Sequence, residues 1–150
     1  MPTKKRIPTW LKVVGIIAVI FIVAIIVAVI VATTATKAPQ KISDQFVNDL
    51  QSSNSSAAYA LTSKTFQQAT TEEQLDNIIQ RVGPVLQGQE KVTGRAIEKS
   101  AGMPETAVLV YTVKTSNGNK YIRTELQKSG GVWQVINFRS ANNPLDTTVE

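Results

Sequence analysis

Cysteine and histidine are both absent from this chain of 150 residues. Without cysteine no disulfide framework can form, and without either residue no thiolate or imidazole is available to ligate a metal. The same absence removes the two side chains that most readily serve as nucleophile or general base near neutral pH. The sequence therefore identifies no catalytic residue, no metal ligand and no cofactor-binding residue, and we expect a protein that is not an enzyme.

Positive charge is in excess only near the N-terminus. The formal net charge is +5, and four basic side chains (Lys4, Lys5, Arg6 and Lys12) precede residue 13. From residue 33 onward twelve basic side chains face eleven acidic ones, which is close to balance. Such a mixture is not typical of a surface that binds a polyanion, so we expect no nucleic acid partner.

A long apolar run follows these basic residues. Residues 13–32 read VVGIIAVIFIVAIIVAVIVA and contain no charged side chain. Roughly 20 residues at about 1.5 Å each match the ~30 Å hydrocarbon layer, which predicts one transmembrane helix. By the positive-inside rule, residues 1–12 form a cytoplasmic tail. The chain is therefore predicted to sit in the cell membrane as a single-pass protein, with its N-terminus cytoplasmic and its C-terminal domain extracytoplasmic.

A cleaved signal peptide is the alternative for this segment. Signal peptides have apolar cores of only about 7–15 residues, followed by a site with small residues. Here the core is longer, and VATTATKA offers only weak sites, such as cleavage after Ala35. An anchor is therefore favoured over a signal peptide.

The remainder divides into a linker at residues 33–40, a domain at residues 41–139 and a tail at residues 140–150. Its first half has helical patterns: an apolar stripe from Ile42 to Leu50, a short piece at Ala57–Leu61, and a helix opened by a Thr71–Gln74 capping box. After Gly88 the period changes to two, which predicts strands. Four strands are expected, at about Lys91–Lys99, Thr106–Thr115, Lys120–Gln127 and Val132–Arg139. The fold class is therefore α+β, with helices packed on a four-stranded antiparallel sheet.

Turn signals at Asn117-Gly118 and Ser129-Gly130 set the register of this sheet. Pairing the strands across both turns collects one apolar face, and a shift of either turn by one residue preserves it. That face consists of Leu109, Tyr111, Val113, Ile122, Leu126, Trp133 and Val135. Together with Tyr59, its Tyr111 and Trp133 are candidates for the lining of a small cleft, with a packed core as the alternative reading.

The opposite face of the sheet is polar at positions such as Thr112 and Arg123, but it is not wholly polar. Four apolar residues are also predicted there: Val108, Val110, Ile136 and Phe138. They form a surface for a protein partner or for a second copy of the chain; the alternatives are apolar residues scattered on the surface and a patch covered by the tail at residues 140–150.

Two segments carry a resemblance to a known superfamily. FVNDLQSSNSSAAYALTSKTFQ at Phe46–Gln67 gives a helix, a small polar break and an alanine-aromatic turn, and GGVWQVINF at Gly130–Phe138 gives the final strand. Across Lys41–Arg139 the chain resembles the nuclear transport factor 2-like (cystatin-like) superfamily, and in particular its small membrane-anchored extracytoplasmic members in bacteria. The resemblance implies a cone of helices on a curved sheet. Because its motifs are packing residues, it implies no catalytic residue.

Three functions are consistent with this layout. The first is a non-enzymatic, membrane-anchored domain that binds an envelope protein or a small ligand outside the cytoplasm. The second is an assembly scaffold of an envelope-spanning secretion or transport complex; inner-membrane components of type IV secretion machines look similar. The third, a hydrolase or isomerase that uses the cavity of the cone, ranks last because the chain has no histidine.

Overall fold

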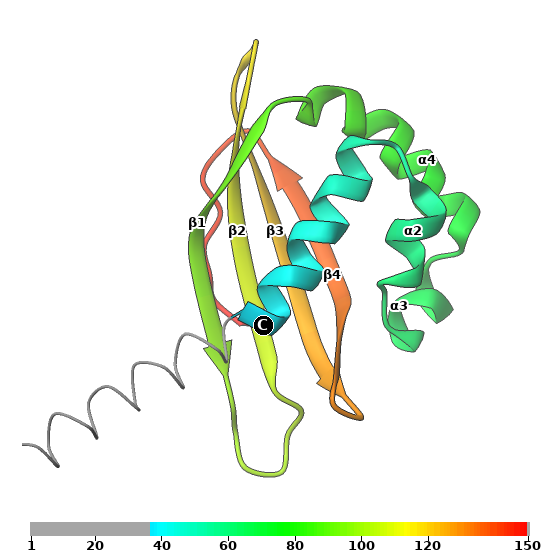
Figure 1. The fold of residues 1–150 in the computed structure, drawn as a ribbon, viewed down its shortest axis with the longest axis vertical. Coiled ribbons are helices and arrows are strands. Elements are labelled where there is room, and N and C mark those ends of the chain that lie inside the picture. Colours follow the sequence, from blue (N-terminus) through cyan, green and yellow to red (C-terminus); the bar gives the residue numbers. More distant parts are fainter. Residues whose placement is uncertain (1–36, 150) are drawn as a thin grey trace, which may run out of the picture. The chain divides into compact units, whose positions relative to one another are not determined.

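The structure, a computed structural model, describes residues 37–149 of the chain. This part is α+β: helices cover one face of a curved, four-stranded antiparallel sheet with strand order β1-β2-β3-β4 (Figure 1). The predicted α+β class and the predicted sheet are confirmed. The predicted transmembrane helix at residues 13–32 lies outside the described residues. Between residues 37 and 149 no helix is long and apolar enough to cross a membrane.

The helical half is built from short elements. Residues 37–51 are helical and are called the first helix here. They are followed by α2 (Ser55–Ala60), α3 (Lys64–Ala69), α4 (Glu72–Val82) and the 3-10 helix η1 (Gly83–Leu86). The first helix includes residues 37–40, which the sequence had placed in the linker. Proline is tolerated near the start of a helix, so Pro39 is compatible with helix formation at residues 37–40. The Pro39 side chain is buried, so this additional turn packs against the rest of the domain.

Local capping explains where two of these helices begin. The predicted capping box at α4 is present: Gln74 N donates to Thr71 Oγ1 at 3.2 Å, and Thr71 N donates to Gln74 Oε1 at 2.9 Å. Ser63 caps α3 in a similar way, because its hydroxyl accepts a hydrogen bond from Phe66 N at 3.1 Å. The sequence pattern does not predict α3, because its six residues are too few for a clear apolar period.

The strands are β1 (Gln89–Glu98), β2 (Thr106–Thr115), β3 (Gly118–Ser129) and β4 (Val132–Ala141). Each turn lies one residue away from its predicted position. Tyr111 pairs with Ile122 and Leu126 pairs with Val135, where the predicted partners were Thr124 and Trp133. The side-chain period of two keeps the same residues on the same face after this shift, so the predicted apolar face is confirmed as far as Val135.

Beyond Val135 the prediction is wrong, because a β-bulge interrupts the β3–β4 pairing. Leu126 pairs with Val135, whereas Glu125 pairs with Asn137, so Ile136 is the extra residue. An extra residue inverts the alternation of every side chain that follows it. Phe138 therefore lies on the helix-covered face, where it packs against the core, and not on the opposite face where the sequence placed it.

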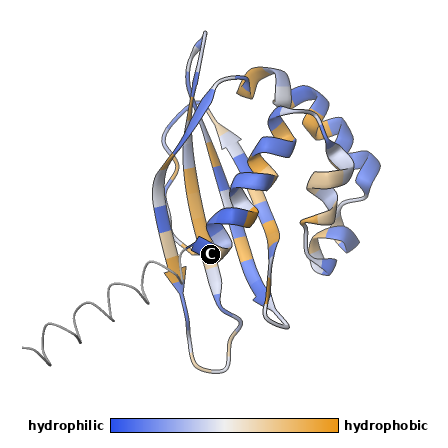
Figure 2. Cartoon of the chain, in the orientation of Figure 1, coloured by the Kyte–Doolittle hydropathy of each residue, from blue (hydrophilic) through white to orange (hydrophobic). Residues whose placement is uncertain are grey.

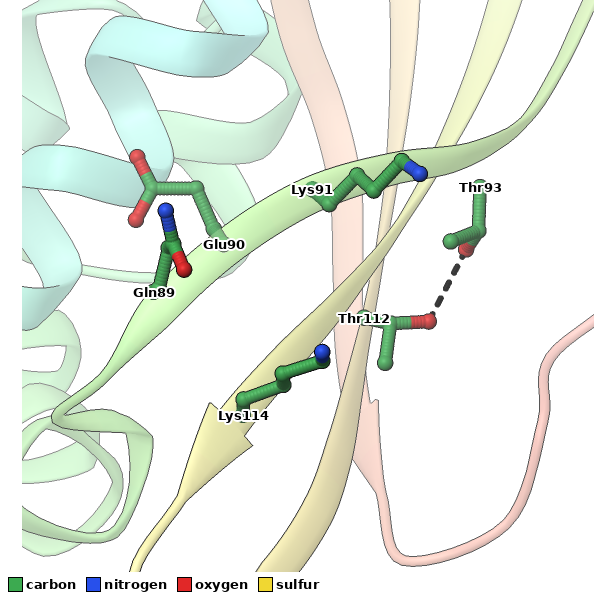
Figure 3. Close-up of a pocket in the computed structure, with 6 residues that line it drawn as sticks. All are labelled: Gln89, Glu90, Lys91, Thr93, Thr112 and Lys114. Carbon is green, nitrogen blue, oxygen red and sulfur yellow. Dashed lines mark hydrogen bonds between the residues drawn. The ribbon is translucent and has the colours of Figure 1, made fainter.

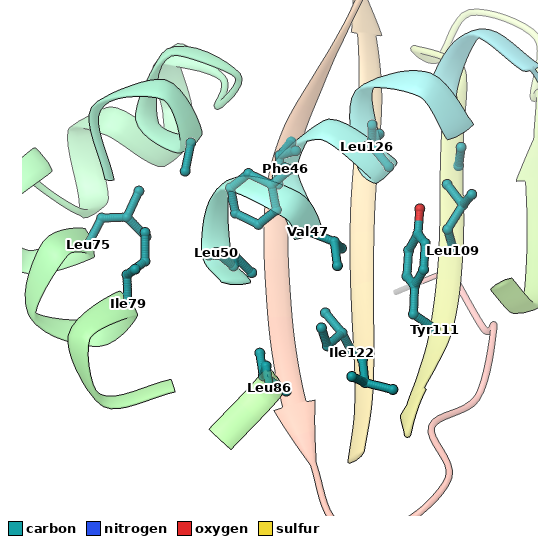
Figure 4. Packing of buried hydrophobic residues seen from close by; sticks show 14 of the residues in the cluster. Phe46, Val47, Leu50, Leu75, Ile79, Leu86, Leu109, Tyr111, Ile122 and Leu126 are labelled. Atoms are coloured by element: carbon teal, nitrogen blue, oxygen red, sulfur yellow. The ribbon is translucent and has the colours of Figure 1, made fainter. Parts of the chain in front are cut away.

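The core lies between the first helix and the sheet (Figure 4). From the helix, Phe46, Val47 and Leu50 have exposed fractions of 0–1%, and they pack on buried sheet residues such as Tyr111 and Ile122. Figure 2 shows that hydrophobic and hydrophilic residues alternate along the first helix and the strands, as expected for elements buried on one side. Burial of these side chains fixes the sheet face that the helices cover.

Candidate functional site

The helix-covered face contains one buried polar cluster, centred on Tyr111 of β2. Tyr111 Oη lies 2.7 Å from Asp44 Oδ1 and 2.8 Å from Ser43 Oγ, and Ser43 Oγ lies 2.5 Å from Thr124 Oγ1. The first helix supplies Ser43 and Asp44, one turn before Phe46 and Val47. Because an ionised carboxylate can only accept hydrogen bonds, the phenol donates its hydrogen to Asp44. The polar groups of this cluster are therefore bonded to one another.

Burial raises the pKa of the Tyr111 phenol far above its ordinary value of 10.0, and the nearby Asp44 carboxylate acts in the same direction. Tyr111 thus stays protonated at any ordinary pH and acts as a hydrogen-bond donor. Its side chain has no exposed surface. In this arrangement Tyr111 tethers the first helix to the sheet.

The three residues predicted to line a cleft contribute to neither of the two pockets described below. Tyr111 is buried, Trp133 is 6% exposed, and both belong to the core. Tyr59 is half-buried on α2, where its hydroxyl donates to the carbonyl of Gln67 at 3.4 Å. Trp133 lies at the start of β4, with Lys128 Nζ 5.7 Å from the centre of its ring. Tyr111 and Trp133 are therefore core residues, which was the alternative to a cleft in the sequence-based prediction.

The C-terminal segment at residues 142–149 crosses the opposite face, called the outer face here. Its attachment point is Arg123 of β3, whose side chain is 2% exposed. Arg123 forms an ion pair with Glu125, and it donates to the main-chain carbonyls of Asp146 (3.2 Å) and Thr148. A β-carbon at Gly94 of β1 would come within 2.8 Å of Thr147 Cγ2, so glycine at this position lets the segment lie close to the sheet.

This segment changes the interpretation of the predicted partner surface. Val108 and Val110 do lie on the outer face, but they are only 1% and 3% exposed. Ile136 occupies the bulge, and Phe138 lies on the other side of the sheet. These four residues therefore do not share one exposed surface, and cover by the tail, one of the readings given by the sequence, agrees with the burial of Val110 near Thr147.

The outer face also bears a pocket of about 320 Å³, beyond the part that the tail crosses (Figure 3). We call it the outer pocket. Its lining comes from β1 and β2 and consists of Gln89, Glu90, Lys91, Thr93, Thr112 and Lys114. Its volume is at the lower end of the range for small-molecule sites, about 300–1,000 Å³.

Sheet register explains why these residues meet. Lys91 pairs with Thr112, and Gln89 pairs with Lys114, so the two lysines occupy diagonal positions on one face. Thr93 Oγ1 lies 3.0 Å from Thr112 Oγ1, which closes one side of the group. Lys91 and Lys114 form no ion pair with any residue between 37 and 149. The outer pocket therefore presents two uncompensated ammonium groups beside two hydroxyls.

Gly88 sets the approach of β1 to β2 at this pocket. A β-carbon at Gly88 would lie 2.0 Å from the carbonyl oxygen of Lys114, so no other residue fits without moving the strand. Gln51, from the end of the first helix, donates to the carbonyls of Leu86 (2.9 Å) and Gly88 (3.4 Å). The pocket thus lies at the end of the domain where the first helix ends, away from Lys37.

A second pocket, of about 230 Å³, lies at the opposite end of β1 and β2. Its lining includes Glu98, Met103 and Val149, and it contains no basic side chain. Over residues 37–149 no group of three or more acidic side chains is placed to hold a metal ion. The outer pocket is consequently the better equipped of the two for a charged ligand.

The residues of the outer pocket do not stand out in the sequence alone. Thr112 was placed on the outer face, but the lysines were treated as ordinary solvated charges. The signal was present as Lys91-x-Thr93 on one strand and Thr112-x-Lys114 on the next, with a period of two in each. Only the β1–β2 register shows that these two patterns lie side by side on one face of the sheet.

Comparisons with known proteins bear on the fold. No family model matches the chain, and no curated protein matches it. Among solved structures, the chain is similar to the 1.8 Å structure of Aln2 from a Streptomyces species, with a TM-score of 0.51 and 11% sequence identity. The match covers 71% of this chain and 89% of Aln2. At this identity the likeness shows the fold alone: helices on a four-stranded antiparallel sheet, an arrangement compatible with the nuclear transport factor 2-like fold.

Proposed function

We propose that this protein is a membrane-anchored binding domain of the nuclear transport factor 2-like type, held outside the cytoplasm and without catalytic activity. In this proposal the apolar run at residues 13–32 is the anchor, and the part from residue 37 onward is the extracytoplasmic domain. The domain binds a small ligand through the outer face of its sheet.

One observation carries the proposal: the polar groups around Tyr111 are bonded to one another, whereas the two ammonium groups of the outer pocket form no ion pair. Tyr111, Ser43 and Asp44 form a closed cluster around a fully buried phenol. Lys91 and Lys114 are exposed and have no acidic partner in the part of the chain that the structure describes. A group whose hydrogen bonds are already made has little to offer a ligand, so the outer pocket is the favoured binding site.

The scaffold alternative receives less support from the sheet. β1 is an edge strand, and an exposed edge is the usual place for another chain to add a strand. However, β1 carries Lys91, Arg95 and a register irregularity between Val92 and Gly94. Charged side chains and bulges of this kind protect edges against pairing. Binding of a ligand is therefore preferred over assembly through β1.

Cysteine labelling in intact cells tests the anchoring and the topology. Because the chain has no cysteine, single substitutions give unambiguous labels. We expect Ser116→Cys, in the exposed β2–β3 turn, to react with a membrane-impermeant maleimide, and Thr3→Cys to react only after the membrane is permeabilised. Both variants should stay in the membrane fraction. Labelling of Thr3→Cys in intact cells, or release of the Ser116→Cys protein into the medium, would contradict the proposal.

A further inference from the structure

The outer pocket combines features that select a particular class of ligand. Lys91 and Lys114 are diagonal neighbours on the sheet, a spacing of about 7–8 Å between backbone positions. Their long side chains can converge on one group placed between them. Figure 3 shows both side chains extended along the same side of the sheet, with the linked hydroxyls of Thr93 and Thr112 beside them.

Protection of the sheet edge does not explain both lysines. A lysine on the edge strand β1 discourages strand pairing, and Lys91 fits that role. Lys114 lies on β2, which has a strand on each side, so it contributes nothing to the edge. Two like charges at neighbouring positions repel each other, and a bound anion removes that repulsion.

The single acidic residue of the lining does not neutralise the pair. Glu90 pairs with Val113, a core residue, so it belongs to the helix-covered side of β1. Figure 3 shows its carboxylate directed away from both ammonium groups. The outer side of the pocket therefore keeps two positive charges and hydroxyl groups.

These donors favour a tetrahedral oxyanion over a planar carboxylate. Two ammonium groups and a hydroxyl, supplied by two strands, can each reach a different oxygen of a tetrahedral phosphate, for which lysine is a common partner, whereas a carboxylate offers only two oxygens in one plane. One hydroxyl of the Thr93–Thr112 pair and the Gln89 amide can donate to further phosphate oxygens. The pocket lies at the end of the domain away from Lys37, so in an anchored protein it opens away from the residue that joins the domain to its linker.

We infer that the outer pocket is a binding site for a soluble phosphate or phosphate monoester, held by Lys91 and Lys114 with one hydroxyl donor from the Thr93–Thr112 pair. This inference rests on the proposed function, because it names the ligand class of the same site.

Calorimetric titration of the full chain in detergent with inorganic phosphate tests the inference. We expect saturable binding that weakens at least tenfold in Lys91→Met and in Lys114→Met. Methionine keeps most of the length of the side chain and removes its charge. Lys99→Met, an exposed lysine beyond the end of β1, is the matched control and should bind within twofold of the wild type. Succinate, a dianion with planar carboxylates, should bind at least tenfold more weakly than phosphate.

Other results would overturn the inference. One such result is the absence of saturable phosphate binding. Another is that Lys91→Met and Lys114→Met bind phosphate as tightly as the wild type, and a third is that Lys99→Met weakens phosphate binding as much as they do. A short-chain phosphatidic acid that binds more than tenfold better than inorganic phosphate would instead assign the pocket to lipid headgroups and contradict a soluble ligand. Circular dichroism must show that each variant is folded. Cysteine labelling is independent of phosphate, so failure of the ligand assignment and failure of the anchored topology are distinguishable.

Discussion

Phe138 of β4 meets Phe46 of the first helix edge to face, with ring centroids 5.2 Å apart and ring planes at 66°. Phe66, just after the capping Ser63, also packs against Phe138, with centroids 6.3 Å apart. Three segments that are distant in sequence thus meet at one aromatic cluster. The contact depends on the bulge at Ile136, which turns Phe138 towards the helices.

Removal of the Phe138 ring should therefore destabilise the fold. Phe138→Ala should lower the free energy of unfolding by about 3 kcal/mol, as expected when a packed aromatic ring is replaced by a cavity. The control Ser140→Ala, at an exposed position two residues later, should change it by no more than about 0.5 kcal/mol. Urea denaturation followed by circular dichroism measures both. A Phe138→Asp protein that stays folded but changes its oligomeric state would restore the predicted partner surface.

The Tyr111 hydroxyl should contribute to stability rather than to turnover. Tyr111→Phe leaves Ser43 and Asp44 without one hydrogen-bond partner, at a cost of about 1–2 kcal/mol. The control is Tyr121→Phe, since the half-buried Tyr121 makes no side-chain hydrogen bond within residues 37–149. Equal stability of the two variants would contradict a structural role for the Tyr111 cluster.

Arg123 and the C-terminal segment should act as one unit. Arg123→Met leaves Glu125 buried without its ion-pair partner, which costs about 3–5 kcal/mol in buried pairs. Truncation after Ala141 removes the carbonyl groups that Arg123 binds and uncovers Val110. The combined variant should lose clearly less stability than the sum of the two losses, because both changes remove the same contacts. Full additivity in a denaturation series would show that the segment is held by other interactions.

Asp49 should make stability depend on pH in the acidic range. Burial raises the pKa of its carboxyl above the ordinary value of 3.8, and Asp49 Oδ2 has no hydrogen-bond partner in the described chain. Well below pH 3.8 the group is protonated in both states; as the pH rises through the folded-state pKa, its charge destabilises the fold. Asp49→Asn should thus raise the melting temperature at pH 7, and the gain should disappear at low pH, where both forms are neutral. A gain that is constant with pH would exclude this cause.

Much of the fold follows from local patterns in the sequence. The period of two, together with two turn signals, predicted the bounds of β2 as they are observed and placed Tyr111, Ile122 and Val135 on one face. Both turns are displaced by one residue from their predicted positions. This displacement did not change which residues share a face, because it moves the strand pairing by two positions. The Thr71–Gln74 capping box likewise needs only residues that are close in sequence.

Features that depend on contacts between distant residues could not be predicted in this way. The bulge at Ile136 has no glycine or turn residue to mark it, and it is stabilised by the packing of Phe138 on Phe46. The outer pocket needs the β1–β2 register, which the loop between Lys99 and Glu105 does not specify with a two-residue turn signal. The sequence alone therefore did not predict that the two lysines of that pocket lie close together.

We propose that ligands bind this domain at the outer face of its sheet and not under the helices. The most direct measurement is a ¹H–¹⁵N NMR titration of the full chain in detergent with inorganic phosphate. We expect shifts of the amide signals of residues 89–93 and 112–114, with those of Ser43 and Asp44 unchanged. Shifts centred on Ser43, Asp44 and Tyr111, or no shifts at all, would contradict it.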